Sequence, residues 1–301
     1  MKFQKITLLL LAVILLPTVA LGQRAEAIRK ALLNPHSDKV LVVAHRGDWR
    51  NAPENSLAAI ENAIKMGVDI VELDVKRTKD GHFILMHDKK LDRTTTGKGL
   101  VSDYTLEEIK KLKLRNGCAI RTKHTVPTLE EAMLLAKGNI MVNLDHDADT
   151  YFDEVFEILK RTGTVDQVIM KGGKKLSTLK ADFGQYLDKV IYMPVCQLDG
   201  EESEAFVLDF LKNLKPAAFE LCYSKVDNSL PAKLQKKLNG KSLIWYNTLW
   251  DTLAGGHDDD AALENPDKSY GYLIETLGAR ILQTDRPAYL LEYLRSKGWH
   301  E

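Results

Sequence analysis

Residues 69–87 read DIVELDVKRTKDGHFILMH, and this stretch decides how the rest of the chain is arranged. Its first part, residues 69–75, is apolar and β-branched around two acidic residues, which predicts a buried strand with Glu72 and Asp74 on one face. Two neighbouring carboxylates on an apolar strand repel each other unless a cation lies between them. The stretch therefore predicts a site for a hard divalent cation.

The second part of the stretch turns the chain back. Asp80-Gly81 is a turn signal, and the seven residues between Val75 and Phe83 are too few for a parallel crossover, which needs roughly a dozen. We therefore expect residues 83–87 to return as an antiparallel hairpin strand. This pairing places His87 opposite Leu73, beside the two carboxylates.

Short apolar segments recur along the chain with helical stretches between them. The first, residues 41–44, ends in His45 and Arg46. With residues 69–75 the series has eight members, and the other six are residues 140–144, 167–170, 190–195, 217–221, 243–246 and 280–283. Eight alternating strands and helices predict an α/β fold of the (β/α)8 TIM-barrel class, with the hairpin strand as an extra.

Polar residues follow these predicted strands where they end, at the barrel face that carries the active sites of this fold class. They are His45, Asp74, Asp145, Lys171, Glu220, Asn247 and Asp285. We therefore expect one site at this face.

Composition limits the possible functions. The chain has 301 residues and is 45% apolar, enough for one large core, and Lys+Arg and Asp+Glu both number 42. With no net field to attract nucleic acid, we expect no nucleic-acid partner. The three cysteines, Cys118, Cys196 and Cys222, lack metal-ligand spacing, so we expect a fold that does not depend on disulfides.

The N-terminal residues have the pattern of an export signal. Lys2 and Lys5 precede an apolar run over residues 8–16, and Ala20-Leu21-Gly22 offers a small-x-small cleavage site. The run is too short to span a bilayer comfortably, and no cysteine lies near the cleavage point, so we expect no stable membrane anchor. The expected mature protein is periplasmic or secreted.

The predicted domain organisation follows from these patterns. Residues 1–22 are the signal, residues 23–39 contain a lead-in helix, and residues 40–301 form the barrel domain. Residues 89–125 are rich in Lys, Thr and Gly around a capping-box helix start, and we expect them to form a small insertion over one face of the barrel.

Ten short motifs in order resemble those of the glycerophosphodiester phosphodiesterase family. They are AHRG at 44–47, PENS at 53–56, GVD at 67–69, ELDV at 72–75, TKDG at 78–81, HD at 87–88, LDRTT at 91–95, TLEEI at 105–109, VPTLEE at 126–131 and QTDRP at 283–287. The resemblance covers nearly all of the chain after the predicted signal and weakens between about residues 171 and 242.

The resemblance implies an enzyme that hydrolyses glycerophosphodiesters to glycerol 3-phosphate and an alcohol. In the implied route the glycerol 2-hydroxyl attacks phosphorus, a cyclic phosphate forms, and water opens it. The implied cation ligands are Glu72, Asp74 and Asp145, and an all-carboxylate set selects Ca²⁺ or Mg²⁺ as the cofactor.

The resemblance also implies the groups that act on the phosphodiester. His45 and His87 would exchange protons, which an ordinary histidine pKa of about 6.5 allows at neutral pH. Arg46 would hold phosphoryl oxygens in its planar fork.

One strand end departs from the family pattern. The family usually carries a glutamate there and a lysine two residues later, whereas this chain has Asp145 and Asp147. We expect Asp145 to be a ligand with a shorter side chain, and Lys171 to supply the missing cation beside the phosphate. The alternatives are an Asp145 that caps the next helix and a Lys171 that faces solvent.

Three further residues are candidates for substrate contact near the phosphate. Glu54 and Asn55 are expected to orient Arg46 or to contact the glycerol, with helix capping as the alternative for Asn55. Glu220 ends a strand at the same face of the barrel.

Residues 251–260 are expected to form a recognition loop or lid for the head group, with Trp245, Tyr246 and Trp250 as its apolar wall. On this interpretation, shortening residues 254–260 changes substrate preference more than stability. The alternative is a flexible loop in which Asp260 caps a helix.

Two other functions stay open at this point. A phospholipase D-like enzyme or an inositol-phospholipid lyase on the same barrel would keep the cation and change the substrate, and a stable cyclic phosphate product would identify a lyase. The second function is that of a phosphodiester-binding protein without turnover. It is motivated by the departure from the family pattern at Asp145 and Asp147. The head group, the choice of cation and the oligomeric state are left open.

Overall fold

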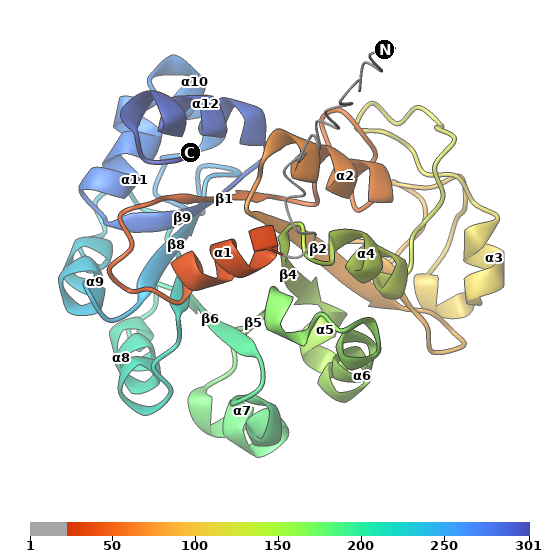
Figure 1. Cartoon of the computed structure of the whole chain (residues 1–301), viewed down its shortest axis with the longest axis horizontal. Coiled ribbons are helices and arrows are strands. Elements are labelled where there is room, and N and C mark those ends of the chain that lie inside the picture. Colours follow the sequence, from red (N-terminus) through yellow and green to blue (C-terminus); the bar gives the residue numbers. More distant parts are fainter. Residues whose placement is uncertain (1–22) are drawn as a thin grey trace, which may run out of the picture.

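The computed structural model describes residues 23–301, so the predicted signal in residues 1–22 lies outside the described part. Eight parallel strands close into a barrel, and a ninth strand extends it as an antiparallel hairpin (Figure 1). The strands are β1 (Leu41–Ala44), β2 (Ile70–Arg77), β3 (Phe83–Leu85), β4 (Met141–His146), β5 (Val168–Gly172), β6 (Ile191–Gln197), β7 (Ala218–Cys222), β8 (Leu243–Asn247) and β9 (Ala279–Thr284). The predicted TIM barrel with an extra hairpin strand is confirmed.

Helices connect the strands and surround the barrel (Figure 1). They are α1 (Gln23–Leu32), α2 (Leu57–Met66), α3 (Leu106–Lys110), α4 (Leu129–Ala136), α5 (Asp147–Thr150), α6 (Phe152–Thr162), α7 (Leu176–Phe183), α8 (Ser203–Asn213), α9 (Leu230–Leu238), α10 (Asp259–Glu264), α11 (Tyr272–Glu275) and α12 (Pro287–Lys297). Among the described residues, none of these helices combines the length and the apolar character needed to cross a bilayer.

The hairpin has the register expected from its turn. Val75 of β2 lies opposite Leu85 of β3, and the amide of Met86 donates to the carbonyl of Asp74 at 2.9 Å. Continuing the same register brings His87 opposite Leu73, beyond the last paired residue of β3.

Alternate strand positions enter two different apolar layers. The residues that face the barrel axis form one cluster with α1, made of Ile28, Leu32, Leu41, Val43, Ile70, Met141, Ile169, Met193, Ala218, Leu243, Trp245 and Ile281. Their neighbours along each strand, such as Val42 and Leu73, pack outward in the layer beneath the helices. Burial on both faces explains why the strands are continuous apolar runs in the sequence.

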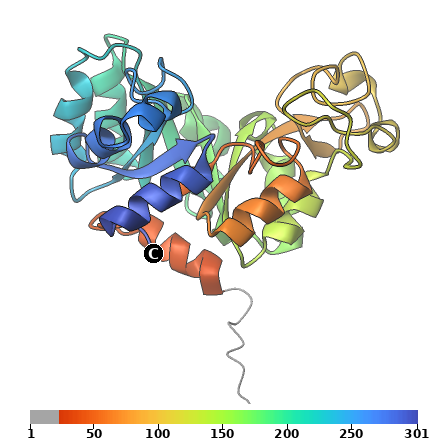
Figure 2. The same cartoon turned by 90° about the horizontal axis from the view of Figure 1, so that it is seen from above.

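The end of the barrel where the strands begin is closed by contacts from both ends of the described chain. Arg24 of α1 donates to the carbonyls of Asn139 and Gly67 at 2.7 and 2.8 Å. The Val40 amide donates to the Trp299 carbonyl at 2.9 Å. Figure 2 shows α1 and the C-terminal end on the same side of the molecule.

His300 belongs to the same closure. Its Nε2 lies 2.8 Å from Asp69 Oδ2, and its side chain is only 10% exposed. His300 is therefore part of the buried contacts at the start of β2 and not a surface residue.

Residues 89–125 pack beside the hairpin rather than across the barrel mouth. Their apolar side chains form a small core of their own with β3 and its flanks, made of Ile84, Met86, Leu91, Val101, Ile109, Leu114 and Val126. Thr105 and Glu108 form the predicted capping box at α3. In Figure 2 this segment projects from the side of the barrel.

Two predicted helix caps are displaced by one or two residues. Ser56, not Asn55, caps α2 by accepting from the Ala59 amide at 3.1 Å. Asp258, not Asp260, caps α10 by accepting from the Ala261 amide at 2.8 Å. Asn55, which does not cap α2, lies in the site, and Asp260, which does not cap α10, is exposed to solvent.

Candidate active site

In every barrel strand except β6, the axis-facing series changes from apolar to polar at the strand's carboxyl end. Two residues after Val43 comes His45, two after Ile70 comes Glu72, and β4, β5, β7, β8 and β9 repeat the change. The polar residues at these positions are Glu72, Asp74, Asn143, Asp145, Lys171, Glu220, Asn247, Gln283 and, directly after β9, Asp285. The predicted strand-end residues therefore share one barrel mouth.

Three carboxylates meet on β2 and β4. Asp74 and Asp145 are register partners on the two strands, and Glu72 lies one axis-facing position below Asp74. Oxygens of Glu72, Asp74 and Asp145 lie within 4.8 Å of one another. Burial raises the pKa of Glu72 well above its usual range, and Asp74 and Asp145 raise it further by repulsion.

This crowding of negative charge fits a divalent cation. Four carboxylates, those of Glu72, Asp74, Asp145 and Glu220, lie beside two permanently charged basic side chains, Lys171 and Arg46, and the His146 imidazole also contacts Asp74. This excess of carboxylates suits a divalent ion, and an all-oxygen donor set suits Ca²⁺ or Mg²⁺. The residues present therefore fit the cofactor that the sequence suggested.

Lys171 enters the mouth from β5. Its Nζ lies 2.9 Å from Asp145 Oδ2 and 3.3 Å from Glu220 Oε2, and its side chain is 5% exposed. Burial alone would lower the pKa of Lys171, but Asp145, Glu220 and Glu72 raise it well above its usual range. The solvent-facing alternative for Lys171 is therefore wrong.

Asp147 turns away from the mouth. Its carboxylate pairs with Lys76 Nζ at 3.0 Å and accepts from the Arg77 amide at 3.1 Å. Asp147, which directly follows β4, therefore ties this part of the chain to β2. The buried lysine beside Asp145 comes from β5 instead.

Arg46 and Asn55 are each held for a different task. Arg46 Nη1 donates to Glu54 Oε1 at 3.1 Å, and its Nε lies 3.3 Å from Asp74 Oδ2, so Glu54 orients the guanidinium as expected. Asn55 instead exchanges two hydrogen bonds with Asp74, at 2.7 and 3.0 Å. Arg46 and Asn55 both have left-handed backbone, with φ of 54° and 55°. The Asn55 side chain therefore fixes Asp74 rather than the Arg46 guanidinium, and its contact with the glycerol stays a prediction.

Each predicted acid–base histidine is backed by an aspartate. His45 Nδ1 lies 2.8 Å from Asp285 Oδ1, and His87 Nδ1 lies 2.8 Å from Asp88 Oδ1. A hydrogen bond from Arg93, and then one from His87, lowers the pKa of Asp88. With Nδ1 occupied in both rings, Nε2 is the nitrogen available to a substrate.

Asp285 is itself fixed by a residue that the sequence did not single out. Oδ1 of Asp259 accepts from the hydroxyls of Thr248, Tyr270 and Thr284 at 2.6 to 2.7 Å, and its Oδ2 accepts from the Asp285 amide at 2.7 Å. Asp259 is 2% exposed. The sequence did not indicate which of the three residues Asp258, Asp259 and Asp260 is buried, because all three lie at the start of the same helix.

The segment around Asp259 is packed, not a lid. Ala254 is buried, and the Gly255 amide donates to the Tyr223 carbonyl at 2.9 Å. A lid and a flexible loop, two of the interpretations given for residues 251–260, do not fit this packing. A recognition role for the head group stays a prediction, and shortening residues 254–260 would remove buried contacts as well as test substrate preference.

The predicted aromatic wall is reduced to one residue. Trp245 is fully buried on the barrel axis, where its Nε1 donates to Asn247 Oδ1 at 2.8 Å, and Tyr246 packs outward against Tyr223. Trp250 alone is in reach of the site, 48% exposed and with its ring edge-on to His45 at 6.5 Å between centroids. A period of two along β8 sends Trp245 and Tyr246 to opposite faces, which excludes a shared wall.

Asn247 links Trp245 to the floor of the site. Its Nδ2 donates to Glu220 Oε1 at 2.8 Å, while Glu220 Oε2 faces Lys171. Glu220 is 4% exposed, so it acts on the site through Lys171.

His146 was missed by the sequence reasoning. It follows Asp145 directly, so a regular strand would turn it outward, but a backbone with φ of 59° and ψ of −120° brings it to the mouth. Its Nε2 lies 3.0 Å from Asp74 Oδ1, and its ring is 4.6 Å from that of His87 between centroids. The strand period therefore misleads at this position.

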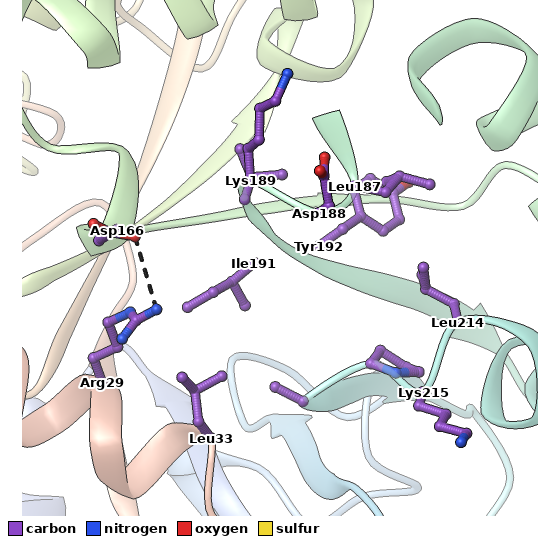
Figure 3. Close-up of a pocket in the computed structure, with 13 residues that line it drawn as sticks. Arg29, Leu33, Asp166, Leu187, Asp188, Lys189, Ile191, Tyr192, Leu214 and Lys215 are labelled. Carbon is purple, nitrogen blue, oxygen red and sulfur yellow. Dashed lines mark ion pairs between the residues drawn. The ribbon is translucent and has the colours of Figure 1, made fainter. Parts of the chain in front are cut away.

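A separate cavity of about 250 Å³ lies at the opposite end of the barrel (Figure 3). It lies between α1 and the beginning of β6, where Arg29 pairs with Asp166 at 3.7 Å and Ile191 forms an apolar wall. The candidate catalytic residues do not line it. The candidate catalytic residues lie at the mouth instead.

Comparison with known proteins agrees with this geometry. The family model described as the glycerophosphoryl diester phosphodiesterase family matches residues 45–226, and one described as a domain of unknown function matches residues 192–294. A glycerophosphodiester phosphodiesterase of Caldanaerobacter subterraneus is 48% identical over 111 residues, 36% of this chain and 45% of the relative. Glycerophosphodiester phosphodiesterase 1 of Bos taurus is 37% identical over 158 residues, 52% of this chain and 45% of the relative. The matches thus span less than half the length of these relatives.

Solved structures show the same fold. A glycerophosphoryl diester phosphodiesterase from Parabacteroides distasonis superposes with a TM-score of 0.75 at 22% identity, covering 91% of this chain and 92% of the other. A phosphodiesterase from Oleispira antarctica, solved in complex with the product sn-glycerol-3-phosphate, superposes with a TM-score of 0.64 at 21% identity, covering 87% and 99%. Since the family model spans more than half of the chain, on a barrel of the same fold, this chain belongs to the glycerophosphoryl diester phosphodiesterase family.

Proposed function

We propose that this protein hydrolyses glycerophosphodiesters to glycerol 3-phosphate and an alcohol with the help of one divalent cation. The observation that carries the proposal is the arrangement at the mouth: a carboxylate cage beside two imidazoles, each backed by an aspartate. The relatives named as glycerophosphodiester phosphodiesterases, and the neighbour solved with sn-glycerol-3-phosphate, support this choice of substrate.

Glu72, Asp74 and Asp145 would hold the cation, Ca²⁺ or Mg²⁺. When bound, the cation supplies Lewis-acid stabilisation of negative charge on a phosphoryl oxygen. Asn55 keeps Asp74 in place for this task through two hydrogen bonds, and the backbone amide of Arg46 donates to Glu72 Oε2 at 3.1 Å.

His45 and His87 move the protons. Nε2 of one imidazole accepts the proton of the glycerol 2-hydroxyl as its oxygen bonds to phosphorus, and Nε2–H of the other protonates the departing alcohol oxygen. In the second step the roles reverse: water loses a proton to one ring and opens the cyclic phosphate, and the 2-hydroxyl regains its proton. Asp285 and Asp88 accept hydrogen bonds from Nδ1–H of the two rings, which leaves each Nε2 available to accept or donate a proton.

Arg46 and Lys171 bind the phosphoryl oxygens and neutralise the charge that develops on them. Arg46 is clamped by Glu54, and Lys171 is held by Asp145 and Glu220, so both cations are ordered before substrate arrives. Trp250 borders His45 and provides an apolar surface for the alcohol. The predicted signal in residues 1–22 supports export to a periplasm or to the medium.

The test is a product screen. The purified protein is given glycerophosphodiesters with choline, ethanolamine, glycerol and inositol head groups under Ca²⁺ and under Mg²⁺, and products are followed by phosphorus NMR. We expect glycerol 3-phosphate, lost on chelation and in His45→Ala but retained in His82→Ala, which removes an exposed histidine away from the mouth. Activity that survives both chelation and His45→Ala contradicts the proposal, and a cyclic phosphate that accumulates as the end product identifies a lyase instead.

A further inference from the structure

A second cluster of metal-ligating side chains shares Asp74 with the carboxylate cage but contains nitrogen. Ligand atoms of Asp74, His87 and His146 lie within 4.8 Å of one another. His146 Nε2 lies 3.0 Å from Asp74 Oδ1, and the rings of His87 and His146 meet edge-on at 85°. In a tetrahedral site with bonds of about 2.0–2.1 Å, ligand atoms lie about 3.3 Å apart. Small shifts would therefore close these three groups around an ion.

The surroundings of His87 suit a metal ligand. Its Nδ1 is held by Asp88, which is held in turn by Arg93 through a 2.8 Å hydrogen bond from Nε. A carboxylate on the second ring nitrogen is the usual support of a metal-bound histidine, because it fixes the tautomer and the ring orientation. His87 Nε2 is thus prepared for a ligand, whether a proton or a metal ion.

His146 is held at the mouth by its neighbours on both sides. Its amide donates to Asp145 Oδ1 at 2.6 Å, and the next residue, Asp147, is tied to Lys76 and to the Arg77 amide. These contacts maintain a left-handed backbone that an L-residue rarely adopts and that turns the ring inward. The proton transfers of the proposed reaction make no use of this third imidazole.

The two clusters differ in the ion they select. Oxygen-only ligands favour Ca²⁺ or Mg²⁺, whereas two imidazoles and one carboxylate favour borderline ions such as Zn²⁺ and Co²⁺. Metal ions about 3.5–4 Å apart share one site in many hydrolases, so occupancy of both clusters is physically compatible.

We propose that Asp74, His87 and His146 form a distinct site for a borderline transition-metal ion such as Zn²⁺, and that its occupancy inhibits the phosphodiesterase. The ion takes the lone pair on His87 Nε2, and the ring then cannot carry a proton. The inhibitory half of this inference rests on the proposed function, whereas the metal site itself does not.

Binding is tested with Co²⁺, whose visible absorption is weak in water and strengthens when the ion enters a tetrahedral protein site. The intact chain is first saturated with Ca²⁺ and then titrated with Co²⁺. We expect one equivalent to bind, to be displaced by Zn²⁺, and to lose affinity roughly tenfold or more in His146→Gln. Glutamine keeps a donor near Asp74 but is a poor ligand, so the variant separates ligation from folding. His82→Gln is the matched control, since His82 is exposed and 3.9 Å from Asp80.

Two outcomes of the titration would overturn the site. Co²⁺ absorption that is unchanged in His146→Gln would place the ion elsewhere, and stoichiometric displacement of Co²⁺ by Ca²⁺ would mean a single shared site.

Inhibition is tested by the ratio of rates with and without one equivalent of Zn²⁺, taken within each variant. We expect the rate to fall at least about tenfold in the unmodified chain and the ratio to stay near one in His146→Gln. A rate that rises with Zn²⁺ would overturn the inhibitory role. A chain that hydrolyses no phosphodiester would refute the proposed function instead, and the Co²⁺ titration would still decide the site.

Discussion

At the scale of single residues, the mouth is organised by charged groups that each have a buried partner. Asp285 shows this most directly, because it joins the His45 ring to the end of β9 and also accepts from Trp49 Nε1 at 2.6 Å. Its role in the proposed reaction is to position the ring rather than to touch the substrate.

We expect Asp285→Asn to lower kcat by roughly a hundredfold or more with little change in KM, because an amide no longer fixes the Nδ1–H tautomer of His45. Steady-state kinetics over a range of pH measures this. An unchanged kcat with a shifted KM would mean that Asp285 acts on binding and not on proton transfer.

The same residue predicts a pH dependence of stability. Burial alone would raise the pKa of Asp285, but the hydrogen bond and charge of His45 lower it below its usual range. A carboxyl group with a depressed folded-state pKa stabilises the fold above its unfolded pKa of about 3.9, and this contribution is lost as the pH falls through the folded value. Urea unfolding from about pH 6 down to about pH 3 should therefore show a smaller loss in Asp285→Asn than in the unmodified chain. Parallel losses in the two proteins would contradict this assignment.

Lys171 should affect cation binding and turnover in opposite directions. Lys171→Met removes the positive charge that lies 2.9 Å from Asp145, so the carboxylate cage should bind Ca²⁺ more tightly. Turnover should fall by about a hundredfold because a donor to the developing phosphoryl charge is lost. Calorimetric titration with Ca²⁺ and steady-state rates measure the two effects, and weaker Ca²⁺ binding would contradict the role given to Lys171.

At the scale of elements, α10 supports the catalytic end of β9. Asp259, its first residue, accepts four hydrogen bonds from Thr248, Tyr270, Thr284 and Asp285. The loop that precedes it is pinned to Tyr223. This region is therefore scaffold that reaches the site through Asp285.

Asp259→Asn should destabilise the fold by about 1–3 kcal/mol, because an amide nitrogen then faces the Asp285 amide and leaves a buried donor unpaired. Chemical unfolding measures the difference. Asp260→Asn is the matched control in the same turn: that side chain is 85% exposed, and its change should stay within about 0.5 kcal/mol. Equal effects of the two substitutions would contradict the buried role of Asp259.

Elements and their order followed from the sequence because parallel strands buried on both faces leave continuous apolar runs. The hairpin register followed from its turn, which placed His87 near the carboxylates. What could not be predicted depends on single backbone angles. A left-handed residue at the end of β4 brings His146 inward against the strand period. Likewise, a one-residue shift of the α2 cap frees Asn55 to hold Asp74.

At the scale of the whole molecule, the groups that stabilise the barrel and the groups proposed for the chemistry lie at opposite ends of its axis. Apolar layers and α1 fill the end where the strands begin, and the buried charges gather at the other. The barrel fold and the shared mouth could be predicted from strand ends, but the pairing of charges across the mouth could not. Which strand supplies the partner of each charge, as β5 does for Asp145, depends on tertiary contacts.

The charges at the mouth should make thermal stability depend on the cation. An ion that binds only the folded state adds about 2.7 kcal/mol at roughly 100 times its Kd. We therefore expect chelation to lower Tm and added Ca²⁺ or Mg²⁺ to restore it. Calorimetry measures both changes. In Glu72→Gln the difference between the chelated and loaded proteins should shrink, and a difference of the same size there would show that the ion binds outside the cage.

The position of the two described chain ends has a practical consequence. α1 and the residues after α12 both lie where the strands begin, as the contacts of Arg24 and His300 show. A linker joined at Gln23 or at Glu301 therefore emerges on the side opposite the mouth. A protein immobilised on a bead or an electrode through either linker would keep its entrance open to the bulk solution.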